Sequence, residues 1–173
     1  MQTLIKESML QAFKRLDELL HEPITLIVGG GSAMILAHGF KLGTSDIDAI
    51  PRGIELAKLD PLIKQIAKEQ NLAPDWLNTY YSTFAFTLPS DYGNRLISVF
   101  QGTKLNALAL GKEEMLIMKC FAHRQKDVPH AKALIKNGVD ITKVETHIES
   151  LKKRRIPGSE TALDFLDDIR DQL

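Results

Sequence analysis

The sequence ITLIVGGGSAMILAHGFKLGTSDIDAI, residues 24–50, decides the fold that we expect for this chain. Its first five residues are an apolar run, rich in β-branched side chains and stopped by three glycines, which predicts a buried strand. The glycines at 29–31 permit a sharp turn whose backbone no side chain covers. Ser32 is expected to cap a helix that ends at Gly39. Free N–H groups at the start of that helix would suit an anion such as phosphate.

A second short strand is predicted at residues 46–50, DIDAI, and it contains two aspartates. Alternate side chains of a strand share a face, so Asp46 and Asp48 should point the same way. Two neighbouring carboxylates repel each other unless a cation or a hydrogen-bond donor compensates them. Mg²⁺ would do so, because it prefers one or two carboxylates together with phosphate oxygens and water. The sequence therefore predicts a phosphate site and a metal site within one short segment.

This combination resembles the signature of the polymerase-β-type nucleotidyltransferase superfamily, in which a small glycine turn and a short helix precede an Asp-x-Asp strand. It is especially similar to small bacterial nucleotidyltransferase-like proteins related to abortive-infection and toxin–antitoxin systems. The resemblance implies that one group of residues holds the triphosphate and that the aspartates hold Mg²⁺ or Mn²⁺. The implied nucleotide-binding residues are Gly30, Gly31, Ser32 and Thr44, and the implied metal ligands are Asp46 and Asp48.

The resemblance extends to a Trp-Leu-Asn string at residues 76–78, which many small relatives carry at this position. Trp76 is expected to be a large buried side chain, with a base-stacking platform as the open alternative. Two features depart from the active relatives. Leu42 stands where relatives commonly have an arginine, and the strand expected at 95–100 contains no third carboxylate but has Ser98 in its place. The sequence therefore identifies no general base and leaves catalytic activity open.

Lys119 is the third catalytic candidate, on a helix that is apolar nearly all round and so is expected to be buried. An ammonium there needs a carboxylate or phosphate partner, because burying an unpaired charge is costly. Two interpretations stay open: Lys119 reaches the aspartate pocket and stabilises charge there, or it extends to solvent. Relatives often carry a Lys…Arg-x-Lys-Asp string on this helix, and Lys119, Arg124 and Asp127 match it. Arg124 and Asp127 are expected to form a structural pair.

The rest of the chain predicts a β-rich middle flanked by helices, with a helical C-terminal third. This pattern indicates an α+β fold with a small mixed sheet. Residues 1–110 are expected to form a nucleotidyltransferase-like core, and residues 111–173 a helical region packed on it. Further strands are expected at 80–88, 95–100 and 104–110, and further helices at 4–20, 54–71, 112–125, 129–137, 142–154 and 160–172.

Composition excludes several classes of protein. Lysine plus arginine and aspartate plus glutamate balance at 22 each, so no global field attracts nucleic acid. The single cysteine, Cys120, excludes an internal disulfide and a cysteine-based zinc cluster. No signal peptide is apparent and no apolar run approaches the ~20 residues that cross a bilayer. A cytoplasmic protein without membrane contact is therefore expected.

Taken together, these features predict a metal-dependent protein that binds a nucleoside triphosphate. If it is active, it transfers a nucleotidyl group to a hydroxyl of RNA, a protein or a small molecule. The alternative is a catalytically inactive binding module, for example one half of a toxin–antitoxin pair with a protein partner. The chain has no Gly-x-Ser-x-Gly, Walker A or paired-histidine motif, which argues against hydrolase, P-loop and zinc-protease classes.

Overall fold

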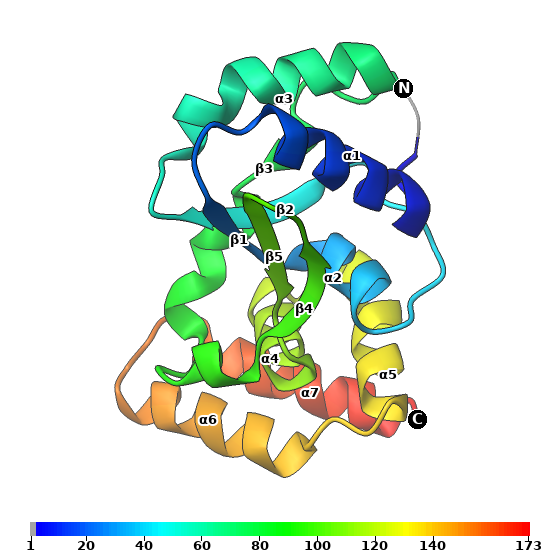
Figure 1. Cartoon of the computed structure of the whole chain (residues 1–173). Helices are drawn as coiled ribbons and strands as arrows, with labels where there is room; N and C mark the ends of the chain where they lie inside the picture. Colours follow the sequence, from blue (N-terminus) through cyan, green and yellow to red (C-terminus); the bar gives the residue numbers. More distant parts are fainter. Residues whose placement is uncertain (1–2) are drawn as a thin grey trace. The chain divides into compact units, whose positions relative to one another are not determined.

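The computed structural model describes residues 3–173, which form two compact units (Figure 1). Unit 1 is the chain up to Ser82 together with Leu96–Leu110. Unit 2 is Thr83–Arg95 together with Gly111–Leu173. No helix among residues 3–173 is both long enough and apolar enough to span a membrane.

Unit 1 is built on a five-stranded mixed sheet with the strand order β3-β2-β1-β5-β4, and Figure 1 shows β1 next to β2 and β5. β1 runs antiparallel to β2 and parallel to β5, β2 runs parallel to β3, and β4 runs antiparallel to β5. This mixed sheet with its helices confirms the predicted α+β class. The strands are β1 (Ile24–Val28), β2 (Ile47–Arg52), β3 (Leu77–Asn78), β4 (Ile97–Gln101) and β5 (Leu105–Ala109).

Three α-helices of the described residues belong to unit 1, and each has buried apolar side chains. They are α1 (Lys6–Leu19), α2 (Gly30–Leu36) and α3 (Leu56–Gln70). On α1 the buried face includes Met9, Phe13 and Leu16, spaced as an amphipathic helix requires. Trp76 is 0% exposed and its indole N–H donates to the Ile63 carbonyl over 2.9 Å. It is therefore a buried core residue, and a base-stacking role is excluded.

Unit 2 is helical, as predicted for the C-terminal third. Its helices are α4 (Lys112–Ala122), α5 (Val128–Lys136), α6 (Ile141–Lys153) and α7 (Ser159–Asp171), with short 3-10 turns at Tyr92–Arg95 and Gln125–Asp127. Leu116, Ile148 and Leu166 are each 0% exposed and represent its core. Cys120 is also buried, and burial raises the pKa of its thiol, so it is an inert core residue as expected.

The prediction of a strand at residues 80–88 is wrong, because Tyr80–Thr87 forms a 3-10 helix. Its hydrogen bonds are local, for example from the Ser82 N–H to the Thr79 carbonyl over 2.9 Å. Tyr80 and Phe86 are 64% and 59% exposed. The aromatic side chains of this segment therefore do not form the buried face of a strand. The strand at 97–101 pairs with β5, from which a short turn separates it.

The Asp17 carboxylate ties α1 to the β4–β5 turn. Its Oδ1 accepts the N–H groups of Lys104 and Leu105 over 2.7 and 2.6 Å, and its Oδ2 accepts that of Thr103 over 3.1 Å. These hydrogen bonds, led by that from Leu105, outweigh the effect of burial and lower the pKa of Asp17. An ionised Asp17 thus anchors the turn at neutral pH.

Asp17→Asn is therefore expected to lower the thermal midpoint by about 3–8 °C at pH 7, since hydrogen bonds to a charged acceptor are lost. The pKa of Asp17 is lower in the folded than in the unfolded state, so its contribution is present above the unfolded value of ~3.9 and is lost as the pH falls below it. The difference between wild type and variant, measured by thermal melts, should shrink as the pH falls from about 5 toward 2. Exposed Asp168 gives the control Asp168→Asn. A difference that does not change with pH would contradict this role.

Candidate functional site

The helix after β1 begins three residues earlier than predicted. α2 begins at Gly30 with Gly29 as its N-cap, so the prediction that Ser32 caps the helix is wrong. Gly30 has a φ of +58°, which lets the chain turn earlier than an ordinary residue would allow. The helix ends at Leu36. Gly39, three residues later, has a φ of +71° and lies in the loop that follows the helix.

Ser32 instead links the turn to the aspartate strand. Its hydroxyl donates to the Gly29 carbonyl over 2.8 Å and accepts the Asp48 N–H over 3.2 Å. The Gly29 N–H in turn donates to the Asp48 carbonyl over 2.8 Å. Ser32 is 1% exposed, so its hydroxyl is engaged inside the unit. We call these three hydrogen bonds the Ser32 junction.

The two aspartates lie where β2 begins. Ile47 and Ala49 are 0% exposed and point into the core. Asp46 and Asp48 alternate with them and are half-buried, as expected for the opposite face of the strand. The two carboxylates therefore alternate with buried side chains at the start of β2, and that of Asp48 lies next to Gly30 of the glycine turn.

Gly30 lies in close contact with the Asp48 carboxylate. A Cβ built on Gly30 would overlap Asp48 Oδ2 and would lie 3.0 Å from Asp48 Cβ. Glycine is thus required here both by the positive φ and by the close approach of the aspartate. This contact, together with the Ser32 junction, fixes the position of Asp48.

Gly30→Ala should destabilise the protein more than Gly39→Ala does. Both glycines have a positive φ, so each substitution costs about 1–2 kcal/mol of conformational strain. Gly39 has open space around its Cβ position, whereas Gly30 faces the Asp48 carboxylate. Urea denaturation should therefore give an additional loss of about 1 kcal/mol or more for Gly30→Ala, since overpacking typically costs that much. Equal losses for the two variants would mean that Asp48 moves aside freely.

Asn78 is a site residue that sequence reasoning did not include. It lies in β3, and the register of the β2–β3 pair places it opposite Asp48. Its Nδ2 donates to Asp46 Oδ2 over 3.1 Å, and its Oδ1 accepts the Tyr80 N–H over 3.0 Å. The side chain is 5% exposed and held on both sides. On β3, the side chain beside the two aspartates is thus an amide and not a carboxylate.

The strand at which active relatives are expected to carry a third carboxylate is β4, and β4 is not a neighbour of β2. β1 and β5 lie between them in the sheet. The Trp-Leu-Asn string could have indicated the strand that neighbours the aspartates, β3, since it contains Asn78. No group of three or more histidine, cysteine, aspartate or glutamate side chains within residues 3–173 could hold a metal ion.

The donor set of this site fits Mg²⁺ or Mn²⁺ only in company with a substrate. Asp46 and Asp48 offer carboxylate oxygens, which are the ligands that these hard cations prefer. Two carboxylates leave most of an octahedral shell to water and phosphate oxygens. The close approach of Gly30 to the Asp48 carboxylate limits the movement of that side chain.

The structure also places two further predicted site residues, Thr44 and Gly31, and Leu42, which departs from the relatives' arginine. Thr44 pairs through its backbone with Leu4, over 3.0 Å for its N–H and 2.8 Å for its carbonyl. Gly31 is the second residue of α2 and is half-buried. Leu42, at the position of the relatives' arginine, is 65% exposed. The structure thus brings Gly30, Ser32, Asp46 and Asp48 together and adds Asn78 to them.

Lys119 lies in unit 2, and its ammonium is 2.7 Å from Asp127 Oδ1. Its side chain is 5% exposed, so the interpretation in which it extends to solvent is wrong. Arg124 Nε donates to Asp127 Oδ2 over 2.7 Å, which confirms the structural pair. Burial alone would raise the pKa of Asp127, but the hydrogen bonds and charges of Arg124 and Lys119 outweigh it and lower that pKa.

A glycine turn bonded to an Asp-x-Asp strand, on a mixed sheet with flanking helices, defines a protein of the nucleotidyltransferase type. A family model described as "Nucleotidyltransferase of unknown function (DUF6036)" matches residues 7–165. The chain belongs to this family. No significant match was found among curated proteins or among solved structures.

Proposed function

We propose that this protein binds a nucleoside triphosphate together with Mg²⁺ or Mn²⁺ at Asp46 and Asp48. We further propose that it transfers a nucleotidyl group to a hydroxyl of RNA, a protein or a small molecule. The observation that supports this best is the Ser32 junction, which joins the glycine turn to the aspartate strand through three hydrogen bonds. Such a junction fixes the distance between a phosphate-binding turn and the ligands of a metal.

Each residue of the site has a defined part in this proposal. Gly30 and Gly31 approach the phosphates, because their backbone carries no side chain. Ser32 positions the turn, and its contact with the nucleotide stays a prediction. Asn78 Nδ2 donates to Asp46 Oδ2 and so orients that carboxylate.

The bound cation would offset the charge of the phosphates and of the transition state. The roles of Thr44 and Lys119 in nucleotide binding and transfer stay predictions. In this proposal Asp46 and Asp48 hold the cation, and the described strand β3 beside them, Leu77–Asn78, carries no third acid. The acceptor hydroxyl must therefore lose its proton to a group outside this set or to the solvent.

The proposal is tested by calorimetric titration of each of the four ribonucleoside triphosphates, once with Mg²⁺ and once with EDTA. We expect binding with Mg²⁺ that weakens at least tenfold when the metal is removed, a difference of about 1.4 kcal/mol. The same titration with a nucleoside gives the contribution of base and ribose without the phosphates. Binding that is equal with and without metal, or no binding of any triphosphate, would contradict the proposal.

Asn78 favours a second candidate function, a module that binds the nucleotide without transferring it. An amide cannot provide the negative charge that a third carboxylate would bring to a two-metal site. In this case the protein would act through a partner, and the toxin–antitoxin relationship suggested by the sequence belongs to this proposal. Incubation with triphosphates labelled at the α-phosphate separates the two candidates. Label transferred to protein or RNA favours the enzyme, and tight binding without transfer favours the module.

A further inference from the structure

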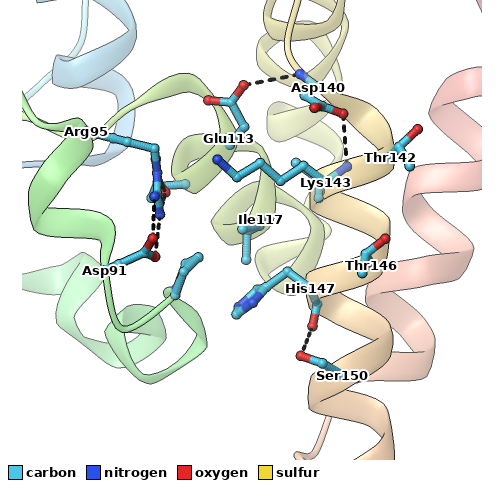
Figure 2. A pocket seen from close by; sticks show the side chains of 13 residues that line it. Asp91, Arg95, Glu113, Ile117, Asp140, Thr142, Lys143, Thr146, His147 and Ser150 are labelled. Atoms are coloured by element: carbon cyan, nitrogen blue, oxygen red, sulfur yellow. Dashed lines mark hydrogen bonds and ion pairs between the residues drawn. The ribbon is translucent and has the colours of Figure 1, made fainter.

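Unit 2 contains a pocket of about 510 Å³ whose lining residues all belong to that unit. Figure 2 shows Arg95 and Asp91 on one side of it, and Lys143 and His147 of α6 on the other. The floor includes Ile117 of α4. A volume of this size falls within the range that holds small organic ligands. None of these residues belongs to the proposed nucleotide site.

The ionisable groups of this pocket have an excess of negative charge. Four carboxylates and two cations line it, which leaves a formal charge of −2 with the histidine neutral. The Arg95 guanidinium donates to both oxygens of Asp91 over 2.9 Å each, and it lies 2.7 Å from Glu114 Oε1. The carboxylates are those of Asp91, Glu113, Glu114 and Asp140, and the cations are Arg95 and Lys143.

Glu114 is the buried member of this group, with 0% exposure. Its Oε1 pairs with Arg95, but its Oε2 has no hydrogen-bond partner among the residues that the structure describes. Gly111 lies close to this oxygen, because a Cβ there would be only 2.6 Å from it. A buried carboxylate oxygen without a donor is costly, and a donor supplied by a ligand would offset that cost.

The other polar groups of the pocket offer mainly acceptors. Glu113 Oε1 accepts the Asp140 N–H over 3.2 Å, and Asp140 Oδ1 accepts the Lys143 N–H over 3.0 Å, so each carboxylate has one further oxygen. His147 Nε2 donates to a carbonyl over 2.7 Å, and its other ring nitrogen is then an acceptor in the neutral ring. The remaining wall is apolar and includes Pro89, Ile117 and Val144.

We propose that this pocket binds a small organic cation, an ammonium compound with an apolar body. The apolar wall would contact the body of the ligand, and the ammonium would donate to the acceptors that the pocket leaves free. The negative excess would discriminate against anions of the same shape. The site is distinct from the nucleotide site in its residues, and its test does not depend on nucleotide binding.

Three probes with the same apolar body test this site: phenethylamine, 2-phenylethanol and phenylacetate. Each is titrated into the full-length protein with ¹³C-labelled methyl groups, and the signals of Ile117 and Val144 are followed by NMR. We expect phenethylamine, which is cationic at pH 7, to shift both signals with at least tenfold higher affinity than phenylacetate. Equal affinities for the three probes, or no shift with phenethylamine, would overturn the proposal.

Two variants locate the binding. Thr146→Trp should fill the pocket from an exposed position of α6 and abolish the shifts, whereas Glu149→Trp, exposed on the same helix but outside the lining, should leave them unchanged.

A third variant tests the charge of the pocket: Glu113→Gln keeps an acceptor for the Asp140 N–H but removes one negative charge. It should weaken the binding of phenethylamine about threefold, as expected for a partly exposed ion pair, and should not weaken that of 2-phenylethanol. Unchanged binding in Thr146→Trp would place the ligand elsewhere and contradict the assignment.

Discussion

Asp46→Asn combined with Asp48→Asn is expected to weaken metal-dependent nucleotide binding by about 100-fold or more while the fold is kept. Two carboxylates are the whole acidic donor set of the site, and amides bind Mg²⁺ or Mn²⁺ poorly. Even the substitution of a residue that only hydrogen-bonds to a metal ligand typically lowers the affinity for the metal 10- to 100-fold. The amide oxygen that replaces the Asp46 carboxylate can still accept from Asn78, and the Ser32 junction uses only the backbone of residue 48. We therefore expect the thermal midpoint of the free protein to change little.

Titration with Mn²⁺, followed by electron paramagnetic resonance, measures this directly because bound Mn²⁺ loses the free-ion signal. Wild type with a triphosphate should bind more Mn²⁺ than the triphosphate alone, and the double variant should not. Asp60→Asn is a matched control, since Asp60 lies in unit 1 with a side chain that is 50% exposed and is paired with Lys64. A double variant that retains Mn²⁺ and nucleotide would remove Asp46 and Asp48 from the site.

Asp127→Ala should be the most destabilising of the substitutions considered, with a loss of about 3–5 kcal/mol in the free energy of unfolding. Asp127 is 0% exposed and accepts from both Lys119 and Arg124. Its removal leaves the Lys119 ammonium, which is 5% exposed, without that counter-charge. Arg124 is 51% exposed and can turn to water, so Lys119 should account for most of the loss.

Urea denaturation of three variants separates these contributions. Lys119→Met in the Asp127→Ala background should recover part of the stability, because it removes the buried charge that Asp127→Ala leaves without its counter-charge. Asp167→Ala, at an exposed position of α7, should change the stability by less than about 0.5 kcal/mol. A double variant less stable than Asp127→Ala alone would show that Lys119 is not the source of the loss.

Two groups of unit 2 make its stability fall in acid. Burial, and then the charge of Lys119, lowers the pKa of His130 to about 4. Its unfolded value is ~6.5, so the unfolded state binds the proton first and stability declines as the pH falls from about 6.5 to 4. The pKa of Asp127 is also lowered, so its contribution is lost only at lower pH, below the unfolded value of ~3.9.

The segment that decides the fold could be predicted well because its signals are local. Residues 24–28 are apolar, β-branched and followed by glycines, and they form β1. The helical spacing of Met9, Phe13 and Leu16 likewise defines α1 without any distant contact. In both cases one periodic pattern, read over a single element, determines which face is buried.

The remaining features depend on which segments meet in space. Asn78 belongs to the site because a two-residue strand pairs with β2, and no periodicity can be read from two residues. Residues 80–87 have the composition of a strand, but no strand pairs with them and they form a 3-10 helix. Ser32 resembled a helix cap, yet its hydroxyl contacts the backbone of a residue 16 positions later. Pairing and long-range hydrogen bonds of this kind cannot be derived from local propensity.

The thermal midpoint, measured with each of the four ribonucleoside triphosphates with and without Mg²⁺, tests the central claim most directly. A ligand that binds only the native protein raises its midpoint by mass action, by an amount equivalent to about 2.7 kcal/mol at 100 times Kd. We predict a rise that requires both triphosphate and Mg²⁺ in the wild type and is absent in the Asp46→Asn/Asp48→Asn variant. A rise of the same size in the variant, or no rise in the wild type at millimolar triphosphate, would contradict a metal-dependent nucleotide site at the two aspartates.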